Sequence, residues 1–462
     1  MSATTLRRIE PAAPVLAAAL LGVAVVALAY RTEPIVPLAL ASGAALLALS
    51  VTRPMLTLYV AVALAPLELV SFQLGAAGIS PAEAMLAASG LGWATSRIVN
   101  GDAPWAATPL GWPLALLVLA LVPGIAVVAE PFSVIKVLIL WTSFFFVYQM
   151  VAVEGTRETV RHLLFVLALS AAVVGAIAVV GAGGAAPDLQ GVGDTATGRA
   201  EGSFGHPNTL ATFEALALPG ALALGLAGPA LLRPAALVSF ALIFAGLVLS
   251  LSRGGLLAVA GALLVMLAWS PFRRTVLVGG LVVLALALAG ASPLGDTQQA
   301  QVLSQRLSSV TYSAGGVDPR FRLWEVTPQI IADHPLVGVG LNAFPEVAPR
   351  YGLFLGNSAT YEHAHNIVLT IAAELGLFGL LPLLWLGAAL LLVLVRGYRV
   401  SPADRGLVLA VAAAFVALIL QGMVDYTLRS AIIVGVVFAV AGCAVALARG
   451  DGETRPGQEA LS

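Results

Sequence analysis

The chain contains about fourteen apolar runs, and most are long enough to cross a membrane as helices, which takes about 20 residues. The runs are continuous, whereas barrel strands alternate apolar and polar residues. We read the first run as an uncleaved helix, because no clear cleavage site follows it and further runs do. The sequence therefore predicts an all-α, polytopic transmembrane bundle of about 12–14 spans. The runs occupy residues 12–30, 35–51, 55–74, 81–98, 110–129, 132–153, 162–182, 208–228, 234–251, 254–270, 275–291, 366–396, 405–423 and 429–448.

Composition excludes several other classes. Hydrophobic residues make up 60% of the chain, charged residues make up 10%, and the mean hydropathy is +0.98, so a soluble globular enzyme is excluded. The net charge of −1 argues against a nucleic-acid partner. A single cysteine, Cys443, rules out a disulfide framework within the chain. The run at 55–74 contains Pro66 and the run at 132–153 follows Pro131, so re-entrant or interfacial segments are an alternative there.

One long segment of more polar character divides the apolar runs. It predicts four regions: transmembrane helices in residues 1–290, a large extracytoplasmic loop in 291–365, C-terminal transmembrane helices in 366–448, and a cytoplasmic tail in 449–462. Asp318-Pro319 predicts the start of a helix in the loop, and His334-Pro335 predicts its end. The apolar spacing of that helix indicates that the loop lies over the bilayer or caps a cavity.

The arginines predict which loops face the cytoplasm. With a cytoplasmic N-terminus and every run crossing, most arginines fall in cytoplasmic loops, as the positive-inside rule requires. The segment 291–365 then faces the exterior together with the loop at 183–207. The short outer loops retain only Arg31, Arg199, Arg253 and Arg429. We therefore expect a bacterial cytoplasmic (inner) membrane protein whose active site faces the periplasm or exterior.

A polar cluster, Tyr361–Asn366, stands where this loop returns to the membrane. Asn366 predicts the N-terminus of a helix, and free N–H groups there favour an anion. Histidine exchanges protons near neutral pH, so His365 is a candidate base, with Glu362, Glu374 or another element of the chain as the group that orients it. His363 next to His365 also allows a metal site, but the sequence has no HExxH motif and no cysteine partner, so neither a metal nor another cofactor is expected.

Two of the outer arginines occupy glycine-containing connections. Arg253 lies in Ser252-Arg253-Gly254, between two long helices, and Arg199 lies in a Gly-rich loop that leads to Asn208. Their simplest interpretation is structural: Arg253 would be an anchor at the membrane interface, and Asn208 a helix cap. Guanidinium groups also match phosphate oxygens well, which makes both arginines candidates for binding a phosphorylated lipid.

Four blocks of sequence resemble the superfamily of bacterial O-antigen ligases and polymerases. His365-Asn366, followed after nine residues by Gly376-Leu377-Phe378-Gly379, resembles the ligase signature. The other blocks occur in the order of the family, and together the four cover roughly residues 200–380. These blocks are Gly202-Ser203-Phe204-Gly205-His206-Pro207-Asn208, Ser252-Arg253-Gly254, and Arg320-Phe321-Arg322-Leu323-Trp324 with Asp333-His334-Pro335-Leu336-Val337-Gly338-Val339-Gly340.

The resemblance implies a metal-independent, inverting glycosyltransferase of the GT-C type. Such enzymes transfer a glycan from an undecaprenyl diphosphate carrier to an acceptor hydroxyl on another glycan, on lipid A core or on a protein. The apolar groove between helices would hold the polyprenyl tail. On this reading, His365, Arg253 and Arg320 are catalytic. The expected substrate-binding residues are Arg199, Arg322, Glu362, His363, Asn366 and Asn208.

Two alternatives remain at this stage. Within the superfamily, the chain could be an O-antigen or exopolysaccharide polymerase instead of a ligase. Outside it, a polytopic transporter or a lipid-linked glycan flippase would also have many spans and few buried charges. The sequence of a transporter would be expected to show two related halves with matching broken helices. The sequence shows no such repeat, and its unusual charges gather at one face, which favours chemistry at the membrane surface.

Overall fold

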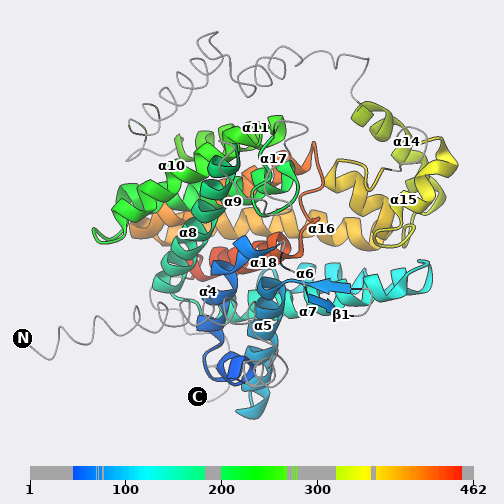
Figure 1. The fold of residues 1–462 in the computed structure, drawn as a ribbon. Helices are drawn as coiled ribbons and strands as arrows, with labels where there is room; N and C mark the ends of the chain where they lie inside the picture. Colours follow the sequence, from blue (N-terminus) through cyan, green and yellow to red (C-terminus); the bar gives the residue numbers. More distant parts are fainter. Residues whose placement is uncertain are drawn as a thin grey trace, which may run out of the picture.

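The computed structural model describes residues 45–182, 199–267, 319–354 and 361–449, with short gaps between 69 and 76 and three isolated positions near 275. The expected runs at 12–30 and 275–291, the first part of 35–51 and the tail from residue 450 lie outside these residues. The described chain is an all-α helical bundle with one short hairpin (Figure 1).

The first half of the chain forms a group of helices that pack side by side. The group begins with a helix at Ala45–Thr52, bent by 120° relative to α4. Helix α5 starts at a capping box, in which the Ser80 hydroxyl accepts from the Glu83 N–H and the Glu83 carboxylate accepts from the Ser80 N–H. The elements are α4 (Pro54–Ala63), η1 (Ala65–Leu67), β1 (Phe72–Leu74), β2 (Ala77–Ile79), α5 (Pro81–Val99), α6 (Gly111–Leu119), η2 (Val122–Ala126), α7 (Pro131–Glu154) and α8 (Arg157–Ala182).

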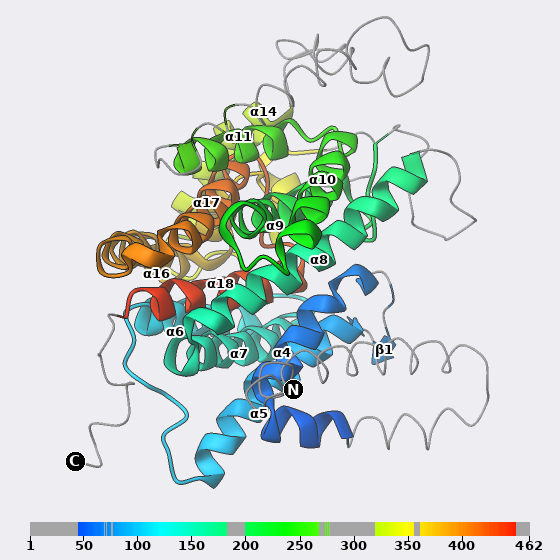
Figure 2. The same cartoon turned by 90° about the vertical axis from the view of Figure 1, so that its left-hand side faces the viewer.

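The second half supplies the helices that surround the candidate site. Helix α16 is the longest of the described helices, with 34 residues, and in Figure 2 it lies beside α17 and α18. The elements are α9 (Pro207–Ala227), α10 (Arg233–Leu249), α11 (Arg253–Leu267), α14 (Pro319–Asp333), α15 (Phe344–Val347), η3 (Ala348–Tyr351), α16 (Ile367–Val400), η4 (Pro402–Asp404), α17 (Arg405–Gly422) and α18 (Ala431–Leu447).

Several helices are long and apolar enough to cross a membrane. Among the described residues, five pass by length and composition, and four shorter apolar helices accompany them. Residues 131–154 form one continuous helix of 24 residues, so the structure favours a full span there over a re-entrant segment. The run at 55–74 is different, because helix α4 ends at Ala63 and a hairpin follows. These helices make the chain a multi-pass membrane protein.

Charged residues gather at the two ends of the bundle. At one end, Arg157 pairs with Asp404 at 2.7 Å, and Arg449 Nη1 donates to the carbonyl of Val153 at 2.6 Å. At the other end, α14 and α15 cover the beginning of α16 (Figure 1). Because α16 runs from one group to the other, the expected outer polar residues and the expected cytoplasmic arginines lie on opposite sides of an apolar slab.

Helix α16 is broken at Gly376, where the loop before α15 joins it. Gly376 has φ 60° and ψ −154°, a conformation that is essentially restricted to glycine. The N–H groups of Val339 and Gly340 donate to the carbonyls of Ala373 and Glu374, both at 2.9 Å. A Cβ on Gly376 would lie 2.4 Å from the backbone of Leu336. The loop therefore packs directly against Gly376, the first glycine of the His-Asn signature.

Candidate functional site

Asn366 caps α16 and holds the neighbouring chain in place. Its Oδ1 accepts from the N–H groups of Val368 and Leu369 at 2.9 and 3.0 Å, as expected of an N-cap. Its Nδ2 donates to the carbonyl of Met423 at 3.0 Å, which ties the start of α16 to the end of α17. His365 precedes the cap with a φ of 50°, an uncommon value for a residue other than glycine.

His365 is paired with Asp425, in the connection between α17 and α18. The His365 Nδ1 and Asp425 Oδ1 atoms are 3.0 Å apart, and Asp425 is 7% exposed. Burial alone would raise the pKa of Asp425, but the hydrogen bond and charge of His365 outweigh it and hold that pKa below its usual range. We expected Glu362, Glu374 or another element of the chain to orient His365, and in the structure the contact is made by Asp425. Asp425 is 60 residues further along the chain than His365, so only the folded structure shows that the two residues are in contact.

Two other histidines lie near this pair as neutral groups. Burial, followed by the charge of His365, lowers the pKa of His363 to about 3. Its ring is 4.3 Å from that of His365 between centroids, and its Nδ1 accepts from the His365 N–H at 3.2 Å. Burial also lowers the pKa of His206, which caps α9 by accepting from the N–H of Asn208. His206 therefore takes the capping position that the sequence suggested for Asn208.

The pair and His363 also form a possible cation site. His363, His365 and Asp425 offer three ligand atoms within 4.8 Å of one another. Two nitrogens and one carboxylate oxygen are a ligand set that zinc uses in enzymes. However, His365 Nδ1 and Asp425 Oδ1 are already engaged with each other, and His363 Nδ1 accepts a backbone N–H. Binding an ion would thus require rearranging at least one of these hydrogen bonds.

Asn208 connects three segments of the chain. Its Oδ1 accepts from Arg199 Nη2 at 3.0 Å and from the Ser252 hydroxyl at 3.1 Å. Its backbone carbonyl accepts from Gln421 Nε2 at 2.9 Å. The Gly-rich loop, the Ser-Arg-Gly turn and the end of α17 are thus held together by one residue. The amide side chain of Asn208 positions an arginine, and the helix does not need it as a cap.

Three arginines expected on the outer side line a common cavity, which we call the arginine pocket. Arg199, Arg253 and Arg320 come from three separate segments and line a cavity of about 50 Å³. Asp425 lines the same cavity, so the arginines adjoin the His365–Asp425 pair. The close approach of Gly254 to the connection after α17 helps to form this wall, because a Cβ there would lie 2.8 Å from Val424.

Other expected site residues lie further from this pocket. Arg322 is on α14 with Arg320, but it is exposed and pairs with Glu325 at 2.9 Å. Glu362 pairs with Arg429 at 2.5 Å on the other side of His363. Asn366 uses its amide for the cap and for Met423. The structure thus brings together His365, Arg199, Arg253, Arg320 and Asn208, while Arg322 lies apart from them.

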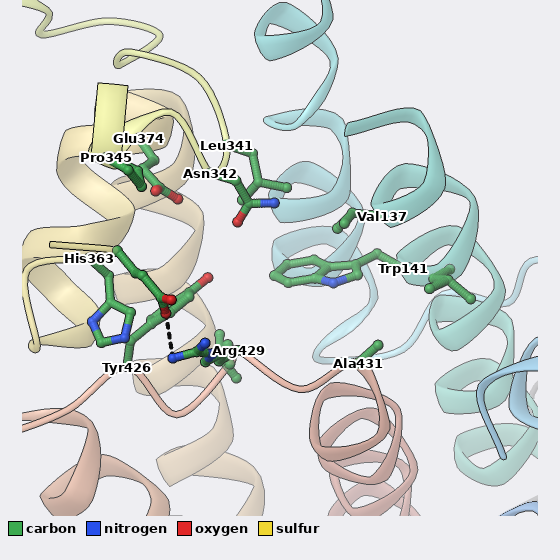
Figure 3. A pocket seen from close by; sticks show the side chains of 13 residues that line it. Val137, Trp141, Leu341, Asn342, Pro345, His363, Glu374, Tyr426, Arg429 and Ala431 are labelled. Carbon is green, nitrogen blue, oxygen red and sulfur yellow. Dashed lines mark ion pairs between the residues drawn. The ribbon is translucent and has the colours of Figure 1, made fainter. Parts of the chain in front are cut away.

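A second cavity lies beside His363, and we call it the tryptophan pocket (Figure 3). It measures about 280 Å³ and lies between α7, the loop before α15 and the connection before α18. Polar side chains line one side of it, among them Asn342, Glu374 and Arg429. The ring of Trp141 reaches into the space opposite them. Of these four side chains, Asn342, Arg429 and Trp141 were not recognised from the sequence as lining a cavity, whereas a buried Glu374 was expected to face a cavity or a partner.

An apolar cavity adjoins the tryptophan pocket. It also measures about 280 Å³, is lined almost wholly by aliphatic and aromatic side chains of α6, α7 and α16–α18, and shares Trp141 and Leu428 with the tryptophan pocket. Its walls lie in the apolar slab of the bundle. A hydrocarbon chain fits such walls, because it needs no hydrogen bonds.

Backbone strain is concentrated around these cavities. Among the described residues, the non-glycine residues with positive φ are Leu251, Asn342 and His365. Leu251 lines the arginine pocket, Asn342 lines the tryptophan pocket, and His365 contacts Asp425 between them. Such conformations cost about 1–3 kcal/mol each and tend to occur at functional sites. All three lie where the surrounding packing must hold them.

Taken together, the bundle and its site define a class: multi-pass membrane proteins with a polar, histidine- and arginine-containing site at one end of the apolar slab. Residues 238–384 match the family model described as O-antigen ligase. This match supports the O-antigen ligase superfamily and, with it, a glycosyltransferase-type activity in polysaccharide biosynthesis. The match includes Arg253, Arg320 and His365, whereas Arg199, Asn208 and Asp425 lie outside it. No curated protein is significantly similar in sequence to this chain.

Proposed function

We propose that this protein transfers a glycan from undecaprenyl diphosphate to an acceptor hydroxyl at the outer face of the bacterial cytoplasmic membrane. The observation that carries the proposal is the shared position of Asp425. This carboxylate lines the arginine pocket and is bonded to His365. A site for an anionic leaving group and a candidate base are therefore adjacent, as a glycosyl transfer requires.

The arginine pocket would bind the diphosphate. A diphosphate leaving group carries its charge on oxygens, and guanidinium groups match such oxygens with paired, charge-assisted hydrogen bonds. Arg253, Arg320 and Arg199 line the pocket from three elements, so they can contact different oxygens. Stabilisation of charge as it develops on the leaving group lowers the barrier of the reaction.

His365 would remove the proton from the acceptor. The Asp425 carboxylate accepts from His365 Nδ1–H, which leaves Nε2 as the acceptor of a proton. In the proposed step, the acceptor oxygen bonds to the anomeric carbon, the bond from that carbon to the phosphate oxygen breaks, and the hydroxyl proton moves to Nε2. Undecaprenyl diphosphate departs with the electron pair. Asp425 would stabilise the imidazolium that forms.

A single displacement of this kind inverts the anomeric centre and needs no metal ion. The arginines supply positive charge where metal-dependent transferases use a cation. The apolar cavity suits the hydrocarbon chain of a lipid-linked substrate. The gathering of arginines at the opposite end of the bundle supports an orientation with the site outside and residues 291–365 as an extracytoplasmic loop.

The acceptor is the finer part of the proposal. We propose ligase activity, because His365-Asn366 with Gly376 and Gly379 resembles the ligase signature; a polymerase would join glycan units with the same residues. Deleting the gene and separating the surface glycans on a gel distinguishes the two. Loss of long chains from their final acceptor is expected for a ligase, and accumulation of single-unit glycan for a polymerase. An unchanged glycan pattern would contradict both.

A further inference from the structure

The tryptophan pocket is connected to the arginine pocket through a row of shared residues. A small cavity between them shares His363, Tyr426 and Arg429 with the tryptophan pocket. It shares Asn208 and Asp425 with the arginine pocket. The two pockets therefore lie on opposite sides of the histidines and Asp425. A ligand in the tryptophan pocket therefore approaches the reaction centre from the side away from the arginine pocket.

Glu374 gives the pocket an unused hydrogen-bonding group. The side chain is 1% exposed, and within the described part of the chain its Oε2 has no hydrogen-bond partner. Leaving such a group buried without a partner costs about 1–3 kcal/mol. A carboxyl accepts hydrogen bonds from hydroxyl groups when ionised and donates one when protonated. In either state it would bind a hydroxylated ligand.

Trp141 gives the pocket an apolar surface opposite this carboxyl (Figure 3). Sugars combine C–H faces, which pack on aromatic rings, with hydroxyl groups at their edges. An indole on one side and a carboxyl with an amide on the other match that combination. Asn342 supplies the amide, and it is held with a φ of 62°. The cavity of about 280 Å³ suits a small ligand and not a polymer.

The charges in the pocket favour an uncharged sugar. Arg429 is already paired with Glu362 at 2.5 Å, so its charge is balanced. The residues that line the pocket therefore offer no unpaired arginine or lysine to an acidic group. A hexuronic acid would bring a carboxylate into a pocket whose arginine is already paired, and a buried charge without a partner is costly. A neutral hexose or an N-acetylhexosamine has no such conflict.

We infer that the tryptophan pocket is the acceptor subsite and binds the uncharged sugar whose hydroxyl attacks the donor. Trp141, Glu374 and Asn342 set its specificity. The inference rests on the proposed function, because it takes the arginine pocket as the donor side. In-line displacement places the acceptor opposite the diphosphate. The tryptophan pocket meets that requirement, because it lies on the other side of the histidines from the arginine pocket.

Saturation-transfer NMR on the purified protein in lipid nanodiscs tests the inference without using activity. The probes are the methyl glycosides of glucose, N-acetylglucosamine and glucuronic acid, with inorganic pyrophosphate as competitor. The two uncharged glycosides should bind, and the glucuronide should bind less. Trp141→Ala and Glu374→Gln should each weaken binding about tenfold, as expected for loss of one strong contact. Trp385→Ala and Glu325→Gln serve as controls, because both residues are exposed and neither lines the tryptophan pocket.

The outcomes separate this inference from the proposed function. Unchanged binding in Trp141→Ala and Glu374→Gln, or no binding by the wild-type protein, would overturn the inference. Competition by pyrophosphate, or loss of sugar binding in Arg253→Ala, would place the sugar on the donor side and also overturn it. Failure of the proposed function would instead appear as pyrophosphate binding that is indifferent to Arg253. A milder variant, Trp141→Phe, should keep most binding if the ring acts as a stacking surface.

Discussion

His365 and Asp425 lie 60 residues apart in sequence, and their Nδ1 and Oδ1 atoms lie 3.0 Å apart. Asp425 also accepts the N–H of Tyr426 at 2.8 Å with the same oxygen, so the carboxylate is held by its own loop. This arrangement fixes the imidazole ring from the Nδ1 side.

Replacing Asp425 with Asn should lower turnover strongly. An amide can offer its N–H to His365, which favours the wrong tautomer and removes the charge that stabilises an imidazolium. The expected loss in kcat is about a hundredfold or more, the usual contribution of a positioned base, with little change in donor KM. Asp333→Asn is the matched control, because Asp333 is exposed and bonds to Tyr351 away from the site. Full activity of Asp425→Asn would remove the base from the account.

Arg320 and Arg322 lie two residues apart on α14 and should behave differently. Arg320 lines the arginine pocket, whereas Arg322 pairs with Glu325 on the surface. Arg320→Ala should weaken pyrophosphate binding about tenfold or more, as expected when a charged hydrogen bond is lost, and Arg322→Ala should not. Calorimetry in nanodiscs measures both. Equal effects would mean that the pocket is not the phosphate site.

Arg253→Lys tests the geometry of the same pocket. A lysine keeps the charge, but it does not reproduce the fork of a guanidinium. We expect this variant to retain folding and lose most of its transfer activity. A fully active lysine variant would reduce Arg253 to an anchor at the membrane interface.

His363 should make the protein less stable in acid. Its pKa falls from 6.5 to about 3 in the folded state, so the unfolded chain binds a proton first as the pH drops. The stability is full above about pH 6.5, and about 2 kcal/mol should be lost by pH 5 from this residue. His363→Gln should therefore show a smaller drop in thermal midpoint between pH 8 and pH 5. His334→Gln, at an exposed position, should match the wild type in that drop; a His363 variant that also does so would contradict the assignment.

Gly376 and Gly387 provide a matched pair within α16. Gly376 has a backbone conformation close to glycine-only and abuts Leu336, whereas a Cβ on Gly387 would meet no atom within 4 Å. Gly376→Ala should destabilise the protein by about 1–3 kcal/mol or more, because strain and a clash add. Gly387→Ala should leave the thermal midpoint nearly unchanged. Similar midpoints for both variants would argue against the locked loop.

The sequence predicted the helical bundle, the helix that starts at Asn366 and the polar cluster in front of it. These features depend on local patterns: apolar length, a capping residue and neighbouring histidines. Asp425, Asn342 and Trp141 were missed, because each reaches the site from a distant segment. The sequence did hold one signal for Asp425: it lies in the short stretch between α17 and α18, which also contains Arg429 and was expected on the outer side. Which histidine it contacts depends on packing.

The central claim is that His365 deprotonates the acceptor while the arginines hold the diphosphate. The most direct measurement compares wild-type protein with His365→Ala in a single-turnover transfer assay, with pyrophosphate binding measured on the same samples. A chelator such as EDTA is added in a parallel reaction to test whether the His363, His365 and Asp425 ligand set holds an ion. The account predicts that His365→Ala abolishes transfer but retains pyrophosphate binding. It also predicts that the chelator leaves wild-type transfer unchanged. Transfer that persists in His365→Ala, or chelator-sensitive transfer that zinc restores, would contradict it.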